Sequence, residues 1–371
     1  TSSGIECVAT DTIQITQPEI LTITLDDLTN VSCNAGSDGE INITADGGCL
    51  SELFQYTFQV QNDEGVLIPS ESISYQEIEN EFGDITAMEV SISNLTEGIY
   101  TIQVTDDNNC LKIEEFEITE PEPINTEVTT ANYNGYGVSC YGDSNGSIDL
   151  TVTGGTIDSD GTLGNDDDYT YAWSGNLDGG GIYSSSTSQD ISNLEPGIYS
   201  VVITDNNGCT TSVDNIEITE PDPLMILDAE IETISCNSGN DGAISVTIQG
   251  GVGTYTYLWS NGATTENATE LELGTYTLTV TDENDCSTTS EAYYVGEPGE
   301  LEVDIIVSEY ACGYNISCYG DNNGNINLEV TGGQPFDDGS YTYEWTGPEG
   351  FTSEEQNLSN LGPGTYTVII S

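Results

Sequence analysis

Cysteines and acidic residues are the chemically reactive groups of this 371-residue sequence, which has 10 Cys and 65 Asp plus Glu. It contains no His, and Lys112 is its one basic side chain. A histidine-based triad, an imidazole metal ligand and a phosphate clamp are therefore excluded. No short CxxC pair of the kind found in zinc sites occurs, so disulfides in an oxidising compartment are expected. The sequence predicts no enzymatic activity and no required cofactor.

Two recurring turns carry most of the cysteines. One cysteine precedes an acidic glycine turn such as "SCNAGSDG", and another ends a turn such as "TDDNNC". Pairing the two cysteines of each full repeat predicts the bridges Cys33–Cys110, Cys140–Cys209 and Cys236–Cys286. These pairs can form only if an even number of strands separates the two cysteines, whereas a seven-strand count places them at opposite ends of the domain.

The remaining cysteines have no partner of this kind. Cys7 and Cys318 would pair with each other between molecules if the start of one molecule completes the last repeat of another. Cys49 and Cys312 stay unassigned, and a Cys312–Cys318 bridge is a competing possibility because the two residues are close in sequence.

Acidic turns raise the question of calcium, which prefers carboxylate and carbonyl oxygens. Tight turns also require Asp, Asn and Gly for conformational reasons, and this explanation is favoured for the recurring turns. The insertion "DSDGTLGNDDD" is the best candidate for a Ca²⁺ site, although it lacks the order of an EF-hand loop. Its candidate ligands are Asp158, Asp160, Asp166, Asp167 and Asp168.

Internal repeats organise the whole chain. Each cysteine turn is followed by "GG", an aromatic strand such as "YTYLW", a turn such as "NLEPGIY", a "TDxxxC" turn and "TEP" or "GEP". The resulting boundaries are 1–18 for the last strand of a preceding repeat, 19–121 for repeat 1, 122–221 for repeat 2, 222–298 for repeat 3 and 299–371 for repeat 4. Repeats 1 and 2 are enlarged, and repeat 3 is compact.

Period-two alternation predicts β-strands throughout. In "AISVTIQ", Ile244, Val246 and Ile248 fall on one face, and no segment has an apolar period of 3.6 residues. The expected fold is all-β, a tandem array of antiparallel β-sandwiches of the immunoglobulin or fibronectin type III kind.

Recurring aromatic residues have two interpretations. Trp173, Trp259 and Trp345 occupy the place of the central core aromatic of a sandwich, and a sugar-stacking platform is the alternative. The "NLxPGxY" turns resemble tyrosine corners formed by Tyr100, Tyr199, Tyr276 and Tyr366. Tyrosines outside these patterns are expected to be exposed adhesive contacts, namely Tyr133, Tyr136 and Tyr183.

The two ends of the sequence fit together. Repeat 4 stops one strand short, and "DTIQITQPE" near the start reads as a last strand without its repeat. The favoured explanation is a window of a longer array. The second explanation is strand addition, in which residues 1–17 of one molecule complete repeat 4 of another.

Together these motifs resemble the SprB repeat. The shared pattern is SC-x-G-x-[DN]-G-x-I, then GG, YTY-x-W, NL-x-PGTY, a D-x-x-x-C turn and TEP, and repeat 1 departs from it because Val60 replaces the Trp. The resemblance implies a filamentous cell-surface adhesin of gliding Bacteroidota, exported by type 9 secretion and moved by the gliding machinery.

The net charge of −64 restricts the partners. Such a chain repels nucleic acid and anionic membranes, and no apolar run is long enough for membrane insertion. Expected partners are neighbouring repeats or identical chains in a filament, and surface or glycan ligands that bind exposed loops. The alternative function is a carbohydrate-binding β-sandwich array of a secreted protein.

Overall fold

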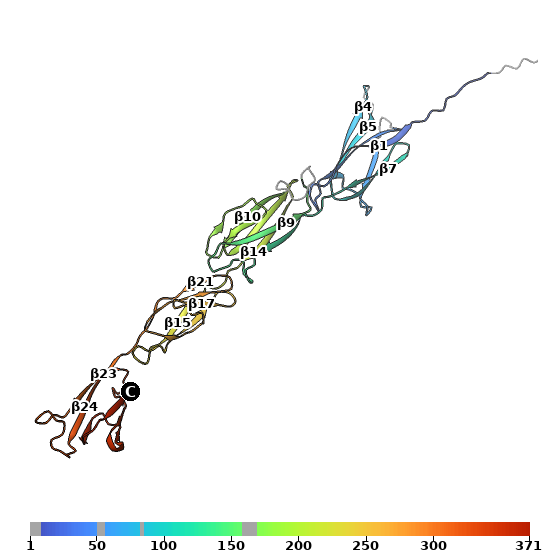
Figure 1. Ribbon diagram of the computed structural model, residues 1–371. Helices are drawn as coiled ribbons and strands as arrows, with labels where there is room; N and C mark the ends of the chain where they lie inside the picture. Colours follow the sequence, from blue (N-terminus) through green and yellow to red (C-terminus); the bar gives the residue numbers. More distant parts are fainter. Residues whose placement is uncertain (1–8, 50–55, 82–84, 158–168) are drawn as a thin grey trace, which may run out of the picture. The chain divides into compact units, whose positions relative to one another are not determined.

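The computed structural model describes residues 9–49, 56–81, 85–157 and 169–371. Antiparallel strands make up the fold (Figure 1), and these residues contain two 3₁₀ turns, Ser70–Ser72 and Pro348–Gly350, but no α-helix. Accordingly, no helix in this part of the chain could span a membrane. The chain forms two compact units, Thr1–Ala131 with Gly146–Ile218 and Asn132–Asn145 with Thr219–Ser371.

Repeat 1 lies in the first unit and has two sheets, with the strand orders β1-β2-β5-β4 and β3-β6-β7. Alternating apolar residues of β2 and β5 face those of β3 and β6 across a common core, for example Ile43, Val90 and Ile102. The strands are β1 (Glu19–Thr29), β2 (Gly39–Gly48), β3 (Thr57–Gln61), β4 (Ile73–Glu79), β5 (Ile85–Leu95), β6 (Gly98–Thr105) and β7 (Leu111–Ile118).

Repeat 2 contributes the other two sheets of the first unit, β12-β9-β8 and β11-β10-β13-β14. This division, with the first, second and fifth strands in one sheet and the third, fourth, sixth and seventh in the other, is that of an immunoglobulin-like sandwich. The strands are β8 (Asn125–Thr130), β9 (Gly146–Thr153), β10 (Tyr169–Leu177), β11 (Ile182–Tyr183), β12 (Ile191–Leu194), β13 (Gly197–Asp205) and β14 (Thr210–Ile218).

Repeat 3 belongs to the second unit and has the sheets β15-β16-β18, β17-β20-β21 and β19-β22. Its strands follow the same order, except that it has no counterpart of the fourth strand and that its sixth and seventh strands are each split in two. The strands are β15 (Met225–Glu232), β16 (Gly242–Gln249), β17 (Thr256–Trp259), β18 (Ala268–Leu271), β19 (Gly274–Tyr276), β20 (Leu278–Thr281), β21 (Ser287–Thr289) and β22 (Tyr293–Val295).

Repeat 4, also in the second unit, has the sheets β23-β24-β27 and β26-β25-β28. Its strands are β23 (Gly299–Val307), β24 (Gly324–Gly333), β25 (Tyr343–Thr346), β26 (Thr352–Ser353), β27 (Leu358–Leu361) and β28 (Thr367–Ile370). β28 takes the place of the sixth strand of the other repeats, and in this structure no seventh strand follows it. The all-β fold expected from the alternation of residues is confirmed.

The three tryptophans lie in the sandwich cores. Trp173 and Trp259 are 1% exposed and Trp345 is 3% exposed. Each indole N–H donates to a backbone carbonyl, that of Ser188, Thr265 and Glu355 respectively. The core interpretation is therefore right, and a sugar platform built on these side chains is not available.

The four tyrosine corners expected from "NLxPGxY" are present. Each hydroxyl donates to the carbonyl four residues earlier, at 2.8 to 3.2 Å. The bond fixes the turn between the fifth and sixth strands, which reverses the chain from one sheet to the other. The donors are Tyr100, Tyr199, Tyr276 and Tyr366.

Candidate functional site

Two disulfides join consecutive repeats. Cys33 of repeat 1 is bonded to Cys209 of repeat 2, with the Cα atoms 5.6 Å apart. Cys140 of repeat 2 is bonded to Cys286 of repeat 3, with a Cα separation of 5.7 Å. In both bridges the cysteine before the second strand of one repeat meets the cysteine after the sixth strand of the next repeat.

The predicted pairs within repeats, Cys33–Cys110, Cys140–Cys209 and Cys236–Cys286, are therefore wrong. The reason is strand direction. In repeat 3, β18 is antiparallel to β16, and the tyrosine corner at Glu272 reverses the chain again into the sixth strand. The second and sixth strands consequently run the same way, so a cysteine before one and a cysteine after the other lie at opposite ends of the sandwich.

The other described cysteines carry free thiols. Cys110, Cys236, Cys312 and Cys318 are exposed, and Cys49 is half-buried. The competing Cys312–Cys318 bridge is therefore not formed. The expected Cys7–Cys318 pair between molecules is not tested, because Cys7 lies outside the described residues.

Each cystine is accompanied by an asparagine that binds the preceding repeat. In the first unit, the Asn207 amide donates to the carbonyl of Ser32 at 3.0 Å. In the second unit, the equivalent Asn284 donates to the carbonyl of Ser139 at 3.0 Å and to that of Tyr133 at 3.2 Å. The motif S-C in one repeat and the motif D-x-N-x-C in the next repeat thus form one junction, in which the Asn amide and the disulfide both join the two repeats.

A buried aspartate shapes the turn that carries the second cysteine. Asp282 is 4% exposed, and its Oδ1 accepts the N–H groups of Asn284 and Cys286, both at 2.9 Å. Its Oδ2 accepts the N–H of Val252 at 2.8 Å. Asp205 and Asp106 accept three backbone N–H groups in the same way.

The "GG" motif provides the space for this carboxylate. A Cβ atom on Gly251 would lie 2.8 Å from Oδ2 of Asp282, and a Cβ on Gly250 would lie 2.0 Å from the carbonyl oxygen of Pro223. Both glycines have positive φ angles, which residues with a side chain rarely adopt. The "GG" motif and the distant "TD" motif therefore form one structural feature, in which the glycine backbone packs against the aspartate carboxylate.

Charge in this turn affects two groups of repeat 1. Burial alone would raise the pKa of Asp106, but the N–H groups of Cys110, Cys49 and Asn108 outweigh it and lower the pKa below its ordinary value. Burial, followed by the negative charge of Asp106, raises the pKa of the Cys110 thiol.

Replacing Asp282 by Asn is expected to destabilise repeat 3 by about 2 kcal/mol, because an amide N–H₂ would face the N–H of Val252 in place of an oxygen. Hydrogen exchange of the Asn284 and Cys286 amides should accelerate by more than tenfold. Asp228→Asn is the control, since Asp228 is exposed on β15 of the same repeat. Equal exchange in the two variants would contradict the role given to Asp282.

The glutamate of "TEP" or "GEP" fixes the first cysteine loop. Oε2 of Glu120 accepts the N–H of Ala35 at 2.6 Å, and Oε2 of Glu297 accepts the N–H of Ser238 at 2.6 Å. Oε2 of Glu220 accepts the N–H of Gly142 at 2.7 Å. In repeats 1 to 3, the end of the repeat thus holds its own "SC" loop in position beside the linker to the next repeat.

The calcium candidates Asp158, Asp160, Asp166, Asp167 and Asp168 all lie outside the described residues. Within the described ranges, no three Asp, Glu, His or Cys side chains come together in a way that could hold a metal ion. The buried aspartates of the second turn have backbone N–H partners, which agrees with a structural role for those turns.

The tyrosines proposed as exposed contacts are only half-exposed. Tyr133 and Tyr136 form a backbone bridge with each other, and the Tyr133 carbonyl belongs to the second junction. Tyr183 packs edge-on against Tyr199, with ring centroids 5.3 Å apart. Exposed tyrosines occur instead beside the first cysteines, at Tyr141 and Tyr319.

Taken together, the fold and its junctions define a tandem array of immunoglobulin-like β-sandwiches joined by disulfides. The SprB repeat family matches residues 25–64, 138–178, 229–264 and 314–350. Each of the four repeats therefore contains a segment that matches the SprB repeat, as the motifs indicated.

Several solved structures match the chain at low sequence identity. Three N-terminal domains of the highly immunogenic outer capsid protein of bacteriophage RB49 match 75% of this chain and 99% of their own, at 16% identity and a TM-score of 0.36. A tetra-tandem repeat from the extending region of a large adhesion protein matches 95% of this chain and 98% of its own length, at 13% identity and a TM-score of 0.26. The BSP domain of a biofilm-associated protein matches 98% of this chain and 96% of its own length, at 10% identity and a TM-score of 0.21. No curated protein matches the chain.

Proposed function

We propose that this chain is a structural and adhesive segment of a long filament on the outer surface of a gliding bacterium. Its repeats act as a covalently reinforced tether, and its loops contact the substratum or glycans. By resemblance to the SprB family, the protein is exported by type 9 secretion and moved along the cell by the gliding machinery. This role requires no cofactor.

The cystines between repeats carry this proposal. Disulfides persist outside the cytosol, and Cys33–Cys209 and Cys140–Cys286 join domains that consecutive linkers already connect. A second covalent connection between domains is of use where the array is pulled. The net charge of −64 favours a soluble, separated filament over bundling.

Labelling of living cells tests the proposal. An antibody raised against the chain should bind intact cells that produce it, and the label should move along the cell surface. Deletion of the coding sequence should abolish the label and reduce spreading on a solid surface. Label that appears only after permeabilisation, or spreading that is unchanged by the deletion, would contradict the proposed role.

A further inference from the structure

Repeat 1 has a cysteine at a position where the other repeats have none. Cys49 directly follows the "GG" that ends β2. The residues at this position in repeats 2, 3 and 4 are Thr156, Val252 and Gln334. Side chains of three different kinds serve the same position, so the fold itself does not require a thiol there.

One carboxylate holds Cys49 beside a second cysteine, Cys110. Oδ2 of Asp106 accepts the N–H of Cys49 at 2.9 Å, and Oδ1 accepts the N–H of Cys110 at 2.7 Å. The carbonyl of Cys49 accepts the N–H of Asp107 at 3.2 Å, and the carbonyl of Cys110 accepts the N–H of Asp106 at 3.1 Å. Both cysteine backbones are therefore fixed to the same two residues of the turn after β6.

Repeat 2 shows where side chains at these two positions point. Thr156 occupies the place of Cys49, and its Oγ1 accepts the amide N–H of Asn207 at 3.1 Å. The same amide donates to the Ser32 carbonyl at 3.0 Å, and the sulfur of Cys209 lies 3.3 Å from that carbonyl oxygen. The side chain after "GG" and the sulfur after the sixth strand thus lie on the same side of the turn. In repeat 1 both positions are cysteines, so two sulfur atoms face the same space.

The electrostatics of the turn agree with this proximity. Burial raises the pKa of the Cys110 thiol, and the negative charges of Asp106 and, less strongly, of Cys49 raise it further. A thiolate affects the pKa of another thiol only when the two are close, because the interaction falls with distance. Cys110 is exposed and Cys49 is half-buried, so a small oxidant can reach the pair.

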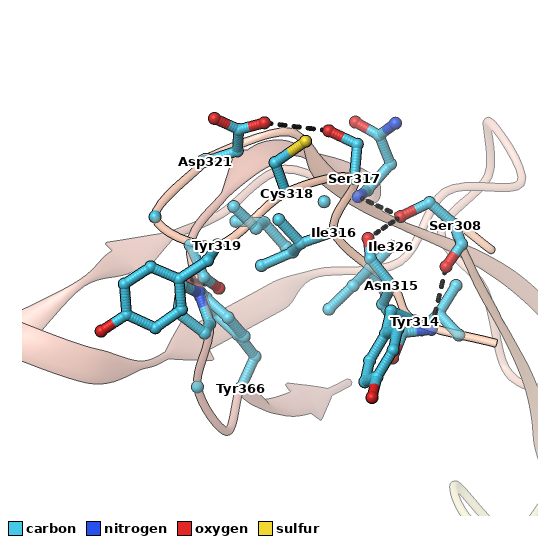
Figure 2. A pocket seen from close by; sticks show the side chains of 18 residues that line it. Ser308, Tyr314, Asn315, Ile316, Ser317, Cys318, Tyr319, Asp321, Ile326 and Tyr366 are labelled. Carbon is cyan, nitrogen blue, oxygen red and sulfur yellow. Dashed lines mark hydrogen bonds between the residues drawn. The ribbon is translucent and has the colours of Figure 1, made fainter. Parts of the chain in front are cut away.

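Cys318 of repeat 4 is the opposite case. Figure 2 shows it on an open loop between Ser317 and Tyr319, where the Ser317 hydroxyl donates to Asp321 at 2.9 Å. Cys318 is exposed, and no second cysteine is among the described residues that line the pocket in Figure 2. A thiol of this kind has no second thiol at hand, whereas Cys110 has Cys49.

We propose that Cys49 and Cys110 are a redox pair, which a small disulfide oxidant such as oxidised glutathione closes into a disulfide within repeat 1. The thiolate of one cysteine attacks a sulfur atom of the oxidant, forms a mixed disulfide and releases one reduced glutathione. The other cysteine then attacks the mixed disulfide and releases the second reduced glutathione. The two thiols lose two electrons and two protons in total, and the oxidant takes them up.

The bond joins the two sheets of repeat 1. Cys49 follows β2 in one sheet, and Cys110 follows β6 in the other. The closed loop contains β3 to β6, and a crosslink of this kind stabilises a fold by restricting the unfolded chain. It would act on one repeat, whereas the cystines Cys33–Cys209 and Cys140–Cys286 join consecutive repeats.

Oxidation of the full 371-residue chain tests the pairing. After treatment with oxidised glutathione, the remaining thiols are blocked with N-ethylmaleimide. A protease that cleaves at acidic residues then digests the chain, because Lys112 is its one basic residue. Mass spectrometry should find a Cys49–Cys110 peptide, which forms at a rate independent of the protein concentration because both cysteines belong to one molecule. Cys318 should accumulate as its mixed disulfide with glutathione.

The variant Cys49→Thr separates the pair from ordinary thiol oxidation. Thr is the residue that repeat 2 has at this position, so the variant should fold. Its Cys110 should retain glutathione, at a level at least about tenfold above that in the unchanged chain, where Cys49 displaces it. The amides of β2 and β6 should exchange hydrogen at least about tenfold more slowly in the oxidised unchanged chain than in the oxidised variant. Cys318→Ser is the matched control and should alter neither result.

Three results would overturn the inference. They are a Cys110 that keeps glutathione in the unchanged chain, a Cys110 bonded to a cysteine other than Cys49, and equal hydrogen exchange in the oxidised chain and the oxidised Cys49→Thr variant. None of these results depends on where the protein resides, so they leave the proposed role at the cell surface to its own test.

Discussion

Reduction of the two cystines is expected to increase the maximum extension of the chain by about 600 Å. The Cys33–Cys209 bridge closes a loop with a sequence separation of 176, and a fully extended residue spans about 3.5 Å. With the bridges intact, a pulling force applied at the two ends passes across the sulfur atoms and leaves that loop slack. Single-molecule force spectroscopy with and without dithiothreitol measures the difference.

The two loops overlap, since their cysteines occur in the order 33, 140, 209, 286. Loss of one bridge therefore releases only part of the hidden length. Cys209→Ser should leave the loop with a sequence separation of 146 closed by Cys140–Cys286, whereas Cys33→Ser combined with Cys140→Ser should reproduce full reduction. Cys312→Ser removes a free thiol and should change nothing. The same extension with and without reductant would show that the bridges do not transmit force.

This staggered arrangement has a consequence for a tether. If one bridge breaks, the overlapping bridge still limits how far the neighbouring domains can unfold, so damage stays local. Bridges within repeats would protect each domain but would leave every linker as a single covalent connection. The pairing found in the structure is therefore better suited to a filament under tension than the pairing expected from the sequence.

The β-sandwich fold could be predicted from the sequence because its strands and turns are encoded by residues that are close together in the chain. The alternation of Ile244, Val246 and Ile248 defines a buried face, and a tyrosine four residues after a turn carbonyl forms a corner in every copy. The core tryptophans were predicted for the same reason. These features need no knowledge of how distant segments are arranged.

The cystines could not be predicted in this way, because their pairing depends on the direction of strands far apart in the sequence. In compact repeat 3, the segment 260–267 connects β17 to β18 without forming a strand. The number of strands between the two cysteines therefore gives the wrong answer on whether they lie at the same end of the sandwich. One signal was present: an Asn stands two residues before Cys209 and Cys286, where a turn alone requires none. Its partner carbonyls, at Ser32 and Ser139, lie in the preceding repeat.

The buried aspartates show the same limit. Asp106, Asp205 and Asp282 belong to the recurring "TDxxxC" turns, but their burial depends on "GG" motifs found 30 or more residues earlier in the chain. Nothing in the residues next to either motif connects the two. Only the fold brings the glycine backbone against the carboxylate.

Replacing Trp259 by Ala is expected to destabilise repeat 3 by about 3–5 kcal/mol, the range for removing a large buried aromatic side chain. Trp259 is 1% exposed and packs in one core with Ile244, Leu278 and Val295. Its indole N–H also donates to Thr265 at 3.0 Å, which holds the segment between β17 and β18. The substitution therefore removes both a core side chain and the anchor of that segment.

Native-state hydrogen exchange of the full chain measures this effect in one repeat. The most protected amides of β16 and β20 should exchange about two to three orders of magnitude faster in Trp259→Ala. Leu258→Ala is a matched control, because Leu258 is the preceding residue and is 56% exposed, so its loss should change the free energy of unfolding by less than about 0.5 kcal/mol. If Trp259→Ala left exchange in repeat 3 unchanged, the tryptophan would not be a core residue, and the sugar-platform interpretation would have to be reconsidered.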